Sequence, residues 1–489
     1  MKKNFIRIAV LTGILTAGSL QAVAQTSNSA YFLEGSTFRH ELNPSFINER
    51  SYVAFPVLGN INLSVQTNSG VGDFLFVRPD GKLTTFLSDE VTRSEFLDAL
   101  PGRSKIGVDL DLSVFSMGFR AFGGFNTIGI DVRSMTDIAI PREFFSFMKD
   151  GLGNESARYH VQNMKVSTTN YAQLAFGHAR PIGEQLTVGA KVKFLIGLGK
   201  ADFLVNDMEI TATPTHWSIQ PHDVSGHISA GGIELKTKGE LNKYTDDDYV
   251  KDEFGEPTDQ LKDGAADRVS FEDIDFNSVS PSGFGMSFDL GASYKLNDDW
   301  SFSAAILDLG FITWGATNNL AMNNTFEFEG FENIAFDDDD NPNSFNNQLD
   351  RITDDLIDLA QFTKEGVGSR TTALAATLNI GAQYTLPVYD RLTFGALSST
   401  RIHGSASWSE MRISANVAPV DWFEASVNYG LSSFGSDMGI MLNFHPRYFN
   451  FYLAAGLPFG RFEPAYFAPI GRANMNLNLG IAFPFGEKE

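Results

Sequence analysis

The groups best suited to chemistry in this chain include an acidic run near its middle. Asp337 to Asp340, followed by Asn341, places oxygen ligands at the spacing of a calcium-binding EF-hand loop. Pro342, however, stands where that loop needs glycine, and Gln348 stands where it needs a bidentate glutamate. We therefore interpret the run as a solvated acidic loop, with a loosely bound divalent cation as the alternative.

Other arrangements typical of metal centres and enzymes are weak. His216, His222 and His227 form the only histidine cluster, and the chain has no cysteine to complete a transition-metal site. No Gly-x-Ser-x-Gly elbow stands between a strand and a helix, and no phosphate-binding loop is found. Motifs alone leave open a serine–histidine hydrolase. We predict a protein that is not an enzyme and uses no cofactor.

Charged residues also alternate with apolar ones in several segments. A lysine or arginine on the lipid side of a membrane strand costs roughly 2–4 kcal/mol near the midplane, so charged faces should line the interior of a closed sheet. We interpret these residues as paired charges that fill and stabilise this interior, with a solute path as the alternative. The residues so placed are Asp109, Asp111, Asp131, Arg133, Lys191, Lys193, Asp289 and Arg412.

Strands must position these groups, and the last stretch of the chain shows the strand pattern most clearly. From Arg472 to Phe485 the odd positions are apolar, whereas the even positions are mostly amide or small residues. Successive side chains of a strand point to opposite faces. An apolar face of this length, ending in an aromatic pair, is typical of a membrane-spanning β-strand. The alternative is an edge strand of a soluble β-sandwich.

The same alternation recurs along the chain and predicts an all-β fold, a transmembrane antiparallel β-barrel. A mean hydropathy of -0.11 agrees, because polar lumen residues dilute the apolar ones. We count fourteen strands; sixteen is the alternative, if 200–283 crosses the membrane twice. The segments are 52–66, 105–119, the return strand through 128–133, 161–178, 185–198, 285–296, 300–314, 373–386, 391–402, 408–417, 422–431, 438–445, 448–457 and 473–485.

The N-terminal residues predict export. A basic start, an apolar stretch and Ala22-Val23-Ala24 form a signal peptide, residues 1–24, cleaved after Ala24. Residues 25–50 lack the period of a strand, and we interpret them as a plug at the periplasmic mouth, with Asn43, Pro44 and Phe46 as its gate. The barrel then spans 51–489. The expected location is the outer membrane.

Connection lengths predict which side each loop faces. Short turns are periplasmic in such barrels and long loops extracellular, which places the loops near 67–104, 141–160, 200–283 and 315–372 outside. Helices are expected at Ser88 to Leu100, from Pro141 to Lys149, and around Leu349 to Leu359. Phe144, Phe145 and Phe147 should pack against neighbouring loops, with a ligand-capturing groove as the alternative.

Two groups of residues carry a family resemblance. Gly35 and Asn43-Pro44-Ser45, which is similar to an Asn-Pro-Ala motif, resemble barrels of the FadL and PorV type. Leu386-Pro387-Val388-Tyr389, Asn416 to Pro419 and Asn443 to Pro446 resemble a Bacteroidetes outer-membrane family known only as a domain of unknown function. The resemblance implies a barrel in the outer membrane.

Two functions follow as expectations. The FadL resemblance implies passive passage or uptake of a hydrophobic or amphipathic solute, gated by the plug, with a path sideways through the wall. The PorV resemblance, with the long acidic loops, implies an accessory or scaffold subunit of a larger outer-membrane secretion or assembly complex. Expected partners are membrane lipid, a hydrophobic small molecule and complex subunits, whereas a net charge of -22 argues against nucleic acid. A continuous apolar groove would favour transport, and a packed lumen the scaffold.

Overall fold

The computed structural model describes residues 28–55, 59–78, 83–150, 156–213, 216–252, 256–270, 275–328, 359, 361–458, 462–463, 468–469 and 472–486. The predicted signal peptide, the run Asp337 to Asp340 and the helix expected around Leu349 to Leu356 lie outside these residues. Among the described helices, none is long and apolar enough to span a membrane.

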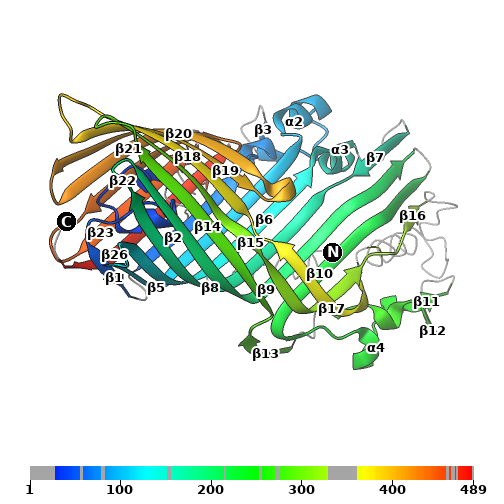
Figure 1. Cartoon of the computed structure of the whole chain (residues 1–489). Helices are drawn as coiled ribbons and strands as arrows, with labels where there is room; N and C mark the ends of the chain where they lie inside the picture. The colour runs from blue at the N-terminus through cyan, green and yellow to red at the C-terminus, as the bar shows by residue number, and fades with distance from the viewer. Residues whose placement is uncertain are drawn as a thin grey trace.

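The strands form one closed antiparallel barrel (Figure 1). The last strand pairs with the first, which is divided in two, and the first pairs with the second, so the sheet has no open edge in the barrel. Fourteen strand positions result, which confirms the predicted number. The strands are β1 (Ser51–Ala54), β2 (Asn60–Thr67), β5 (Arg103–Ala121), β6 (Gly124–Pro141), β8 (Met164–Ile182), β9 (Leu186–Ala212), β14 (Gly283–Lys295), β15 (Trp300–Ala321), β17 (Thr363–Ala373) with β18 (Ala376–Thr385), β19 (Leu392–Ile402), β20 (Trp408–Val420), β21 (Phe423–Ser432), β22 (Gly435–Phe444), β23 (Asn450–Pro458) and β26 (Ala473–Phe485).

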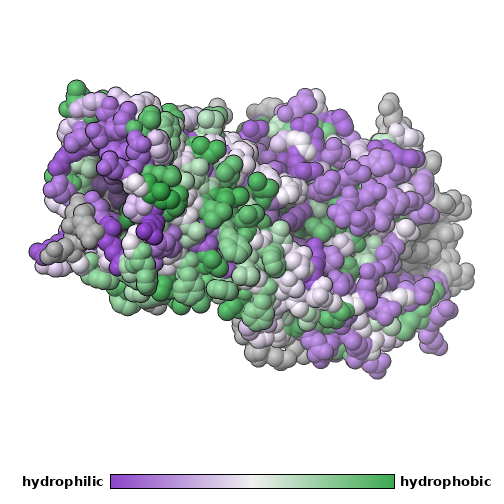
Figure 2. Space-filling model, viewed as in Figure 1, coloured by the Kyte–Doolittle hydropathy of each residue, from purple (hydrophilic) through white to green (hydrophobic). Residues whose placement is uncertain are grey.

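The two faces of the barrel wall differ in polarity as the alternation predicts. In β26, Asn474, Asn476 and Asn478 are buried in the lumen, whereas Leu477 and Leu479 are partly exposed outside. Figure 2 shows apolar side chains gathered on the face of the barrel that is turned to the viewer. Aromatic rings gather near the short turns, where amphipathic side chains favour a membrane interface: examples are Trp300 against Tyr384 and Phe423 against Phe444. This is the architecture of an outer-membrane β-barrel.

The turn between β5 and β6 differs in register from the sequence prediction. In the sequence, the pair Gly123-Gly124 predicts a hairpin turn at these two residues. In the structure the residues with positive φ are Phe122, at 57°, and Gly123, at 72°. Two successive positive values are typical of a type I′ turn, which matches the right-handed twist of the strands it joins. The turn is therefore one residue earlier, and Gly124 begins β6.

Several strands continue beyond the barrel into a largely hydrophilic extension (Figures 1 and 2). β9 runs on to Ala212 and pairs with β10, so the 200–283 region contains a hairpin that adds no barrel strand. The helix expected over 88–100 is shorter, because a capping box between Thr92 and Glu95 starts it at Arg93.

The remaining elements belong mostly to this extension or to loops. They are strands β3 (Leu75–Val77), β4 (Leu83–Thr85), β7 (Ala157–Val161), β10 (Trp217–Glu234), β11 (Tyr249–Lys251), β12 (Pro257–Leu261), β13 (Asp275–Ser280), β16 (Phe326–Phe328), β24 (Phe462–Glu463) and β25 (Ala468–Pro469). The helices are α2 (Arg93–Ala99), α3 (Arg142–Asp150), α4 (Lys238–Leu241), η1 (Asn28–Ala30), η2 (Thr37–Glu41), η3 (Val71–Asp73), η4 (Asp246–Asp248), η5 (Ala265–Asp267) and η6 (Gly404–Ala406).

Candidate functional site: the barrel lumen and its N-terminal segment

Residues 28–48, here called the N-terminal segment, lie inside the barrel (Figure 1). Their side chains and peptide groups bond to strands on several sides of the lumen. Asn28 donates to Ser399 and Glu410, while Asn379 donates to the carbonyl of Leu42. The segment therefore bridges strands that do not neighbour one another in the sheet.

The backbone of one residue of this segment, Gly35, is held by the wall through both its N–H and its carbonyl group. The Gly35 N–H donates to the Glu424 carboxylate at 3.0 Å, and the Asn450 amide donates to the Gly35 carbonyl at 3.3 Å. A Cβ at Gly35 would lie 2.6 Å from the imidazole of His445. Only glycine leaves room for this close approach.

The predicted gate residues lie directly against the inner face of the wall. The Asn43 amide donates to the carbonyl oxygens of Ala292 and Ala304, at 3.4 and 3.3 Å. A Cβ on Gly189 would lie 2.1 Å from the Pro44 carbonyl oxygen, and one on Gly291 would lie 2.1 Å from Asn43 Oδ1. At these two glycines the wall has no side chain between its backbone and the N-terminal segment.

Gly291→Val is expected to displace the N-terminal segment, because the added side chain would overlap Asn43 and Pro44. The chain has no native cysteine, so Ser45→Cys, at a buried position, provides a single labelling site. Folded barrels carrying both changes should react faster with a maleimide than barrels with Ser45→Cys alone. Gly102→Val is the control, since a Cβ there meets nothing within 4 Å. Equal labelling rates would show that the segment does not depend on this contact.

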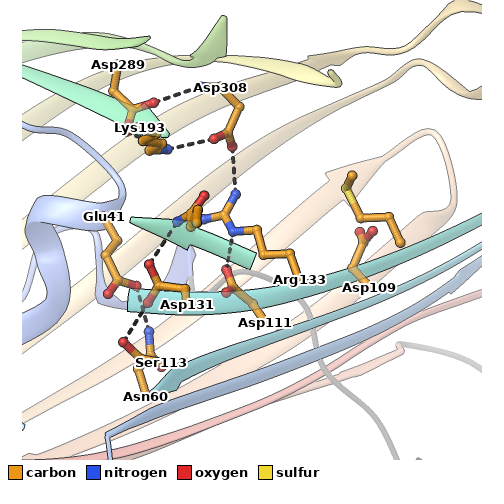
Figure 3. A network of polar contacts seen from close by, with 12 residues as sticks. Glu41, Asn60, Asp109, Asp111, Ser113, Asp131, Arg133, Lys193, Asp289 and Asp308 are labelled. Carbon is orange, nitrogen blue, oxygen red and sulfur yellow. Dashed lines mark hydrogen bonds and ion pairs between the residues drawn. The ribbon is translucent and has the colours of Figure 1, made fainter. Parts of the chain in front are cut away.

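Charged side chains meet in the middle of the lumen (Figure 3), and we call Asp111, Arg133, Lys193, Asp289 and Asp308 the lumen charge cluster. Arg133 lies 3.1 Å from Asp111 and 2.8 Å from Asp308. Lys193 lies 2.7 Å from Asp289 and 2.6 Å from Asp308. Pairing of opposite charges offsets the free-energy cost of removing these side chains from water. Four of the predicted lumen residues are brought together here.

The other predicted lumen residues have separate partners. Asp109 pairs with Arg401 at 2.6 Å, and Asp131 accepts hydrogen bonds from Ser113 and Gln173. Arg412 belongs to a second buried group, in which it lies 2.8 Å from both Glu410 and Asp437. The role of each residue in function stays a prediction.

Lys191 has a partner that the sequence did not indicate. Its ammonium donates to His40 Nδ1 at 2.9 Å. Because an ammonium only donates, Nδ1 must be an acceptor, so His40 Nε2 carries the proton and donates to the Tyr52 hydroxyl. Burial, and then the neighbouring Lys191, lower the pKa of His40 well below its usual value. His40 is therefore neutral.

Asp308 and Glu41 are central residues that the sequence analysis missed. Alternation from Phe302, Ala304 and Ile306 places Asp308 on the lipid face, but a bulge opposite Asp289 turns it into the lumen. The φ of Asp308 is 57°, and its N–H donates to Asp289. An aspartate on an apolar face was the available signal for this bulge. Glu41 lies in a segment without a strand period, so no pattern marked it.

The wall is irregular beside this bulge. β15 pairs with β18 as far as Leu307 and with β17 from Phe311 onward, and Leu374 and Ala375 separate those two strands. On the outer face an apolar depression of about 660 Å³, here called the wall hollow, is lined by residues that include Gly189, Leu290, Gly291, Ala304, Ile306 and Leu378. On the inner side a cavity of about 80 Å³ reaches Leu307, Asp308 and Ala375.

The predicted loop-helix residues are packed among other side chains. Phe145 is 7% exposed and lies 5.4 Å from Phe74, ring centre to ring centre. Phe147 lies 5.5 Å from Trp217, and Phe144 packs in the same cluster. These contacts favour loop packing over a ligand-capturing groove.

Metal-binding arrangements were also sought among the described residues. Within them, no group of three or more histidine, aspartate or glutamate side chains is arranged to hold a metal ion. The residues compared above with an EF-hand loop, Asp337 to Asn341, lie outside the described residues.

Comparison with known proteins adds a family. Residues 44–456 match the model of a family described as "Family of unknown function (DUF5723)", as the sequence resemblance indicated. No curated protein matches the chain.

Solved structures include similar barrels at low identity. The toluene transporter TodX of Pseudomonas putida is 10% identical, with 94% of each chain covered and a TM-score of 0.39. The toluene transporter TbuX of Ralstonia pickettii is 10% identical over 95% of this chain and 96% of its own, with a TM-score of 0.40. A FadL homologue of Pseudomonas aeruginosa is 10% identical over 95% and 99%, with a TM-score of 0.37. Scores this low assign no function.

Proposed function

The chain belongs to the DUF5723 family, and we propose that it is a non-enzymatic outer-membrane barrel that admits a small hydrophobic or amphipathic solute sideways through its wall. In this proposal the hydrophilic extension and long loops lie outside the cell and the short turns in the periplasm. The observation that carries the proposal is the irregular wall between the wall hollow and the inner cavity.

The wall hollow has the properties of an entry site for an apolar molecule. Its lining is mostly glycine, alanine and aliphatic residues, and Leu290 and Leu378 remain exposed there. An apolar solute can cover this surface at little cost in free energy, because it takes the place of water or lipid against apolar side chains. Ile306, beside the bulge, lines the hollow, and the next two residues line the inner cavity. The proposed route therefore passes the irregular part of the wall around Asp308 and Ala375.

The N-terminal segment would act as the gate of this route. Asn43 and Pro44 cover the inner side of Gly189 and Gly291, where the wall has no side chains. Phe46 fixes the segment nearby through an edge contact with Tyr31, at 5.1 Å, and lies under the guanidinium of Arg39, at 4.3 Å. The wall at Gly189 and Gly291 presents only backbone atoms to the lumen. If Asn43 and Pro44 moved away, a passage would therefore open there.

The polar filling of the lumen disfavours passage of an apolar solute along the barrel axis. Buried charges and amides occupy its middle, and the N-terminal segment bonds across it. The same packing favours a second candidate, an accessory or scaffold subunit of a larger outer-membrane complex. In that case the hydrophilic extension would be the part that meets other subunits.

Ala304→Trp tests the lateral route. Ala304 is exposed on the outer face and lines the wall hollow, so an indole there would fill the hollow without entering the lumen. Cells with this variant should accumulate a hydrophobic fluorescent naphthylamine dye at roughly the rate of cells without the protein. Ala396→Trp is the matched control, because Ala396 is also an exposed alanine of the outer face, but lies on β19 outside the hollow.

The two candidates give different results in this experiment. Uptake that is lost with Ala304→Trp and kept with Ala396→Trp supports the route through the wall. Uptake that is equal in both variants and in cells without the protein contradicts it. In that case recovery of other outer-membrane subunits in fixed proportion with the barrel, after gentle detergent extraction, would favour the scaffold.

A further inference from the structure

The seam at which the barrel closes presents buried oxygen atoms without hydrogen-bond donors. On the lumen face Asn478 of β26 lies opposite Asn62 of β2, and Asn476 lies opposite Ser64. All four side chains are at most 6% exposed. Among the described residues, the amide oxygens of Asn62, Asn476 and Asn478 and the hydroxyl of Ser64 have no hydrogen-bond partner. Buried polar atoms in folded proteins nearly always have one, so this group needs a physical explanation.

Carboxylates continue the same rows of the sheet. Asn62 lies opposite Asp111 on its other side, and Ser64 lies opposite Asp109. Cross-strand neighbours of this kind have Cβ atoms about 4.5–5.5 Å apart. The lumen side of β26, β2 and β5 is therefore a continuous patch of oxygen acceptors.

An enclosed space borders this patch. The inner cavity of about 80 Å³ is lined by Asn62, Asp109 and Asp111 from the wall and by Glu41 from the N-terminal segment. A second cavity of about 30 Å³ shares Glu41 and Asp111 with it. One water molecule needs a cavity of about 10–15 Å³, so the larger cavity has room for an ion with part of its hydration shell.

Negative charge is in excess around these two cavities. The six carboxylates lining them are those of Glu41, Asp109, Asp111, Asp131, Asp289 and Asp308, and the four cations are those of Arg133, Lys191, Lys193 and Arg401. His40 also lines the smaller cavity but is neutral, because its Nδ1 accepts from Lys191. The cations already serve other partners: Arg133 and Lys193 bond within the lumen charge cluster, and Arg401 bonds to Asp109.

Two of these carboxylates, Glu41 and Asp131, have no ion pair among the described residues, and Glu41 is the one that lines the larger cavity. It accepts a hydrogen bond from Asn60 at 2.6 Å, and it has no ion pair with any described residue. Figure 3 shows it beside Asp131. With Asn28 and Leu42, it lines the larger cavity from the N-terminal segment.

The structure assigns to the larger cavity a binding site for a small monovalent cation, held between Glu41 of the N-terminal segment and the unpartnered amide oxygen of Asn62 at the seam. Amide and carboxylate oxygens are the ligands that replace the water of such ions in proteins. A divalent ion fits less well, because it requires more carboxylate ligands than Glu41, the one carboxylate without an ion pair in the larger cavity, supplies. The bound ion would join the N-terminal segment to the closing strands. This inference does not depend on the proposed route through the wall.

The protonation of Glu41 makes the site dependent on pH. Burial, and then Asp131 and Asp111, raise the pKa of Glu41 to about 8, although Lys191 and Arg133 oppose the shift. Its pKa is raised in the folded barrel, so the folded state binds the proton more tightly than the unfolded one. Without the ion, the resulting stability is full below the ordinary pKa of the group and is lost as the pH rises through about 8. Cation binding should therefore matter more at pH 9 than at pH 6.

The test measures thermal unfolding of the purified full-length barrel in detergent at both pH values. Sodium chloride and potassium chloride are each compared with choline chloride at equal ionic strength. At least one of the two metal ions should raise the unfolding midpoint by several degrees at pH 9, saturably, and less at pH 6. Asn62→Leu and Glu41→Gln should lose this dependence, and Glu41→Gln should also lose the fall between pH 6 and pH 9. Asn416→Leu is the matched control: Asn416 also has a buried, unpartnered amide oxygen, but it does not line this cavity.

Several outcomes would overturn the assignment. A midpoint that is equal in sodium, potassium and choline, with only the pH dependence present, would mean that a proton alone occupies the site. A rise that persists in both Asn62→Leu and Glu41→Gln would place the ion elsewhere. A larger rise with magnesium or calcium than with either monovalent ion would contradict the class of ion. Glu41→Gln keeps the oxygen that accepts from Asn60, so it tests the site even if Asn62→Leu fails to assemble.

Discussion

Arg133→Met is expected to lower the free energy of unfolding by roughly 3 kcal/mol, the lower end of the range for removal of one partner of a buried charge pair, because the side chains of Arg133, Asp111 and Asp308 remain 15–21% exposed. Arg133 is the cation shared by Asp111 and Asp308. Its loss leaves Asp111 without an ion-pair partner and Asp308 with Lys193, which already pairs with Asp289. Carboxylates already outnumber cations around these cavities, so a lost cation has no substitute nearby.

The matched control for this prediction is Asp308→Asn. Removal of this carboxylate leaves two balanced pairs, Arg133 with Asp111 and Lys193 with Asp289. Asparagine also tolerates the positive φ at this position. The expected cost is about 1 kcal/mol, that of a weakened hydrogen-bond network. Urea unfolding of the barrel in lipid vesicles, followed by tryptophan fluorescence, gives both values. A cost for Asp308→Asn equal to that for Arg133→Met would contradict the charge imbalance in the lumen.

Leu479→Arg is the second substitution with a large expected effect. Leu479 lies on the outer face of β26, between Ile61 of β2 and Leu453 of β23. An arginine there would face lipid, at a cost of roughly 2–4 kcal/mol near the midplane. Folded proteins have a net stability of about 5–15 kcal/mol, so a finished barrel could survive this change. The main effect should fall on assembly, because β26 must pair on both sides to close the sheet.

The amount of folded barrel in the outer membrane measures this effect, as the fraction that changes mobility on a gel after heating. Leu479→Arg should reduce that fraction several-fold, whereas Leu479→Met, which keeps the volume and the apolar character, should not. Similar amounts of both variants would show that this face of β26 does not meet lipid. Asn478→Arg is a poorer control than the alternation alone indicates, because Asn478 is only 3% exposed in the lumen.

The N-terminal segment connects the two proposals without making them equivalent. Asn43 and Pro44 lie on the wall at Gly189 and Gly291, whereas Glu41 lines the inner cavity of about 80 Å³. Loss of solute uptake in Ala304→Trp would bear on the first contact only. Loss of cation dependence in Glu41→Gln would bear on the second only. If both hold, cation binding would favour the seated segment, and therefore the closed wall.

The sequence by itself determined the class of fold and the face on which most strand residues lie. Alternation is a local property: successive side chains point to opposite faces wherever the strand is regular, so Asn478 is placed in the lumen and Leu479 outside without knowledge of any partner strand. The number of strands follows from the same pattern and from the connection lengths. Lys193 and Asp289 were placed in the lumen for this reason, and in the structure they pair at 2.7 Å.

Only the tertiary structure decided which lumen residues meet and where the pattern fails. Asp308 is turned inward by a bulge, which shifts the residues that follow it, as far as Trp314, relative to the simple alternation. Lys191 bonds to His40 and Asp109 to Arg401, because partners across a lumen depend on how the closed sheet is staggered and on what fills it. Glu41 lies in a segment that has no period at all. Its place beside Asn62 and Asp111 exists only after the barrel closes around it, since contacts between residues this distant in sequence are made by closure and not by local pattern.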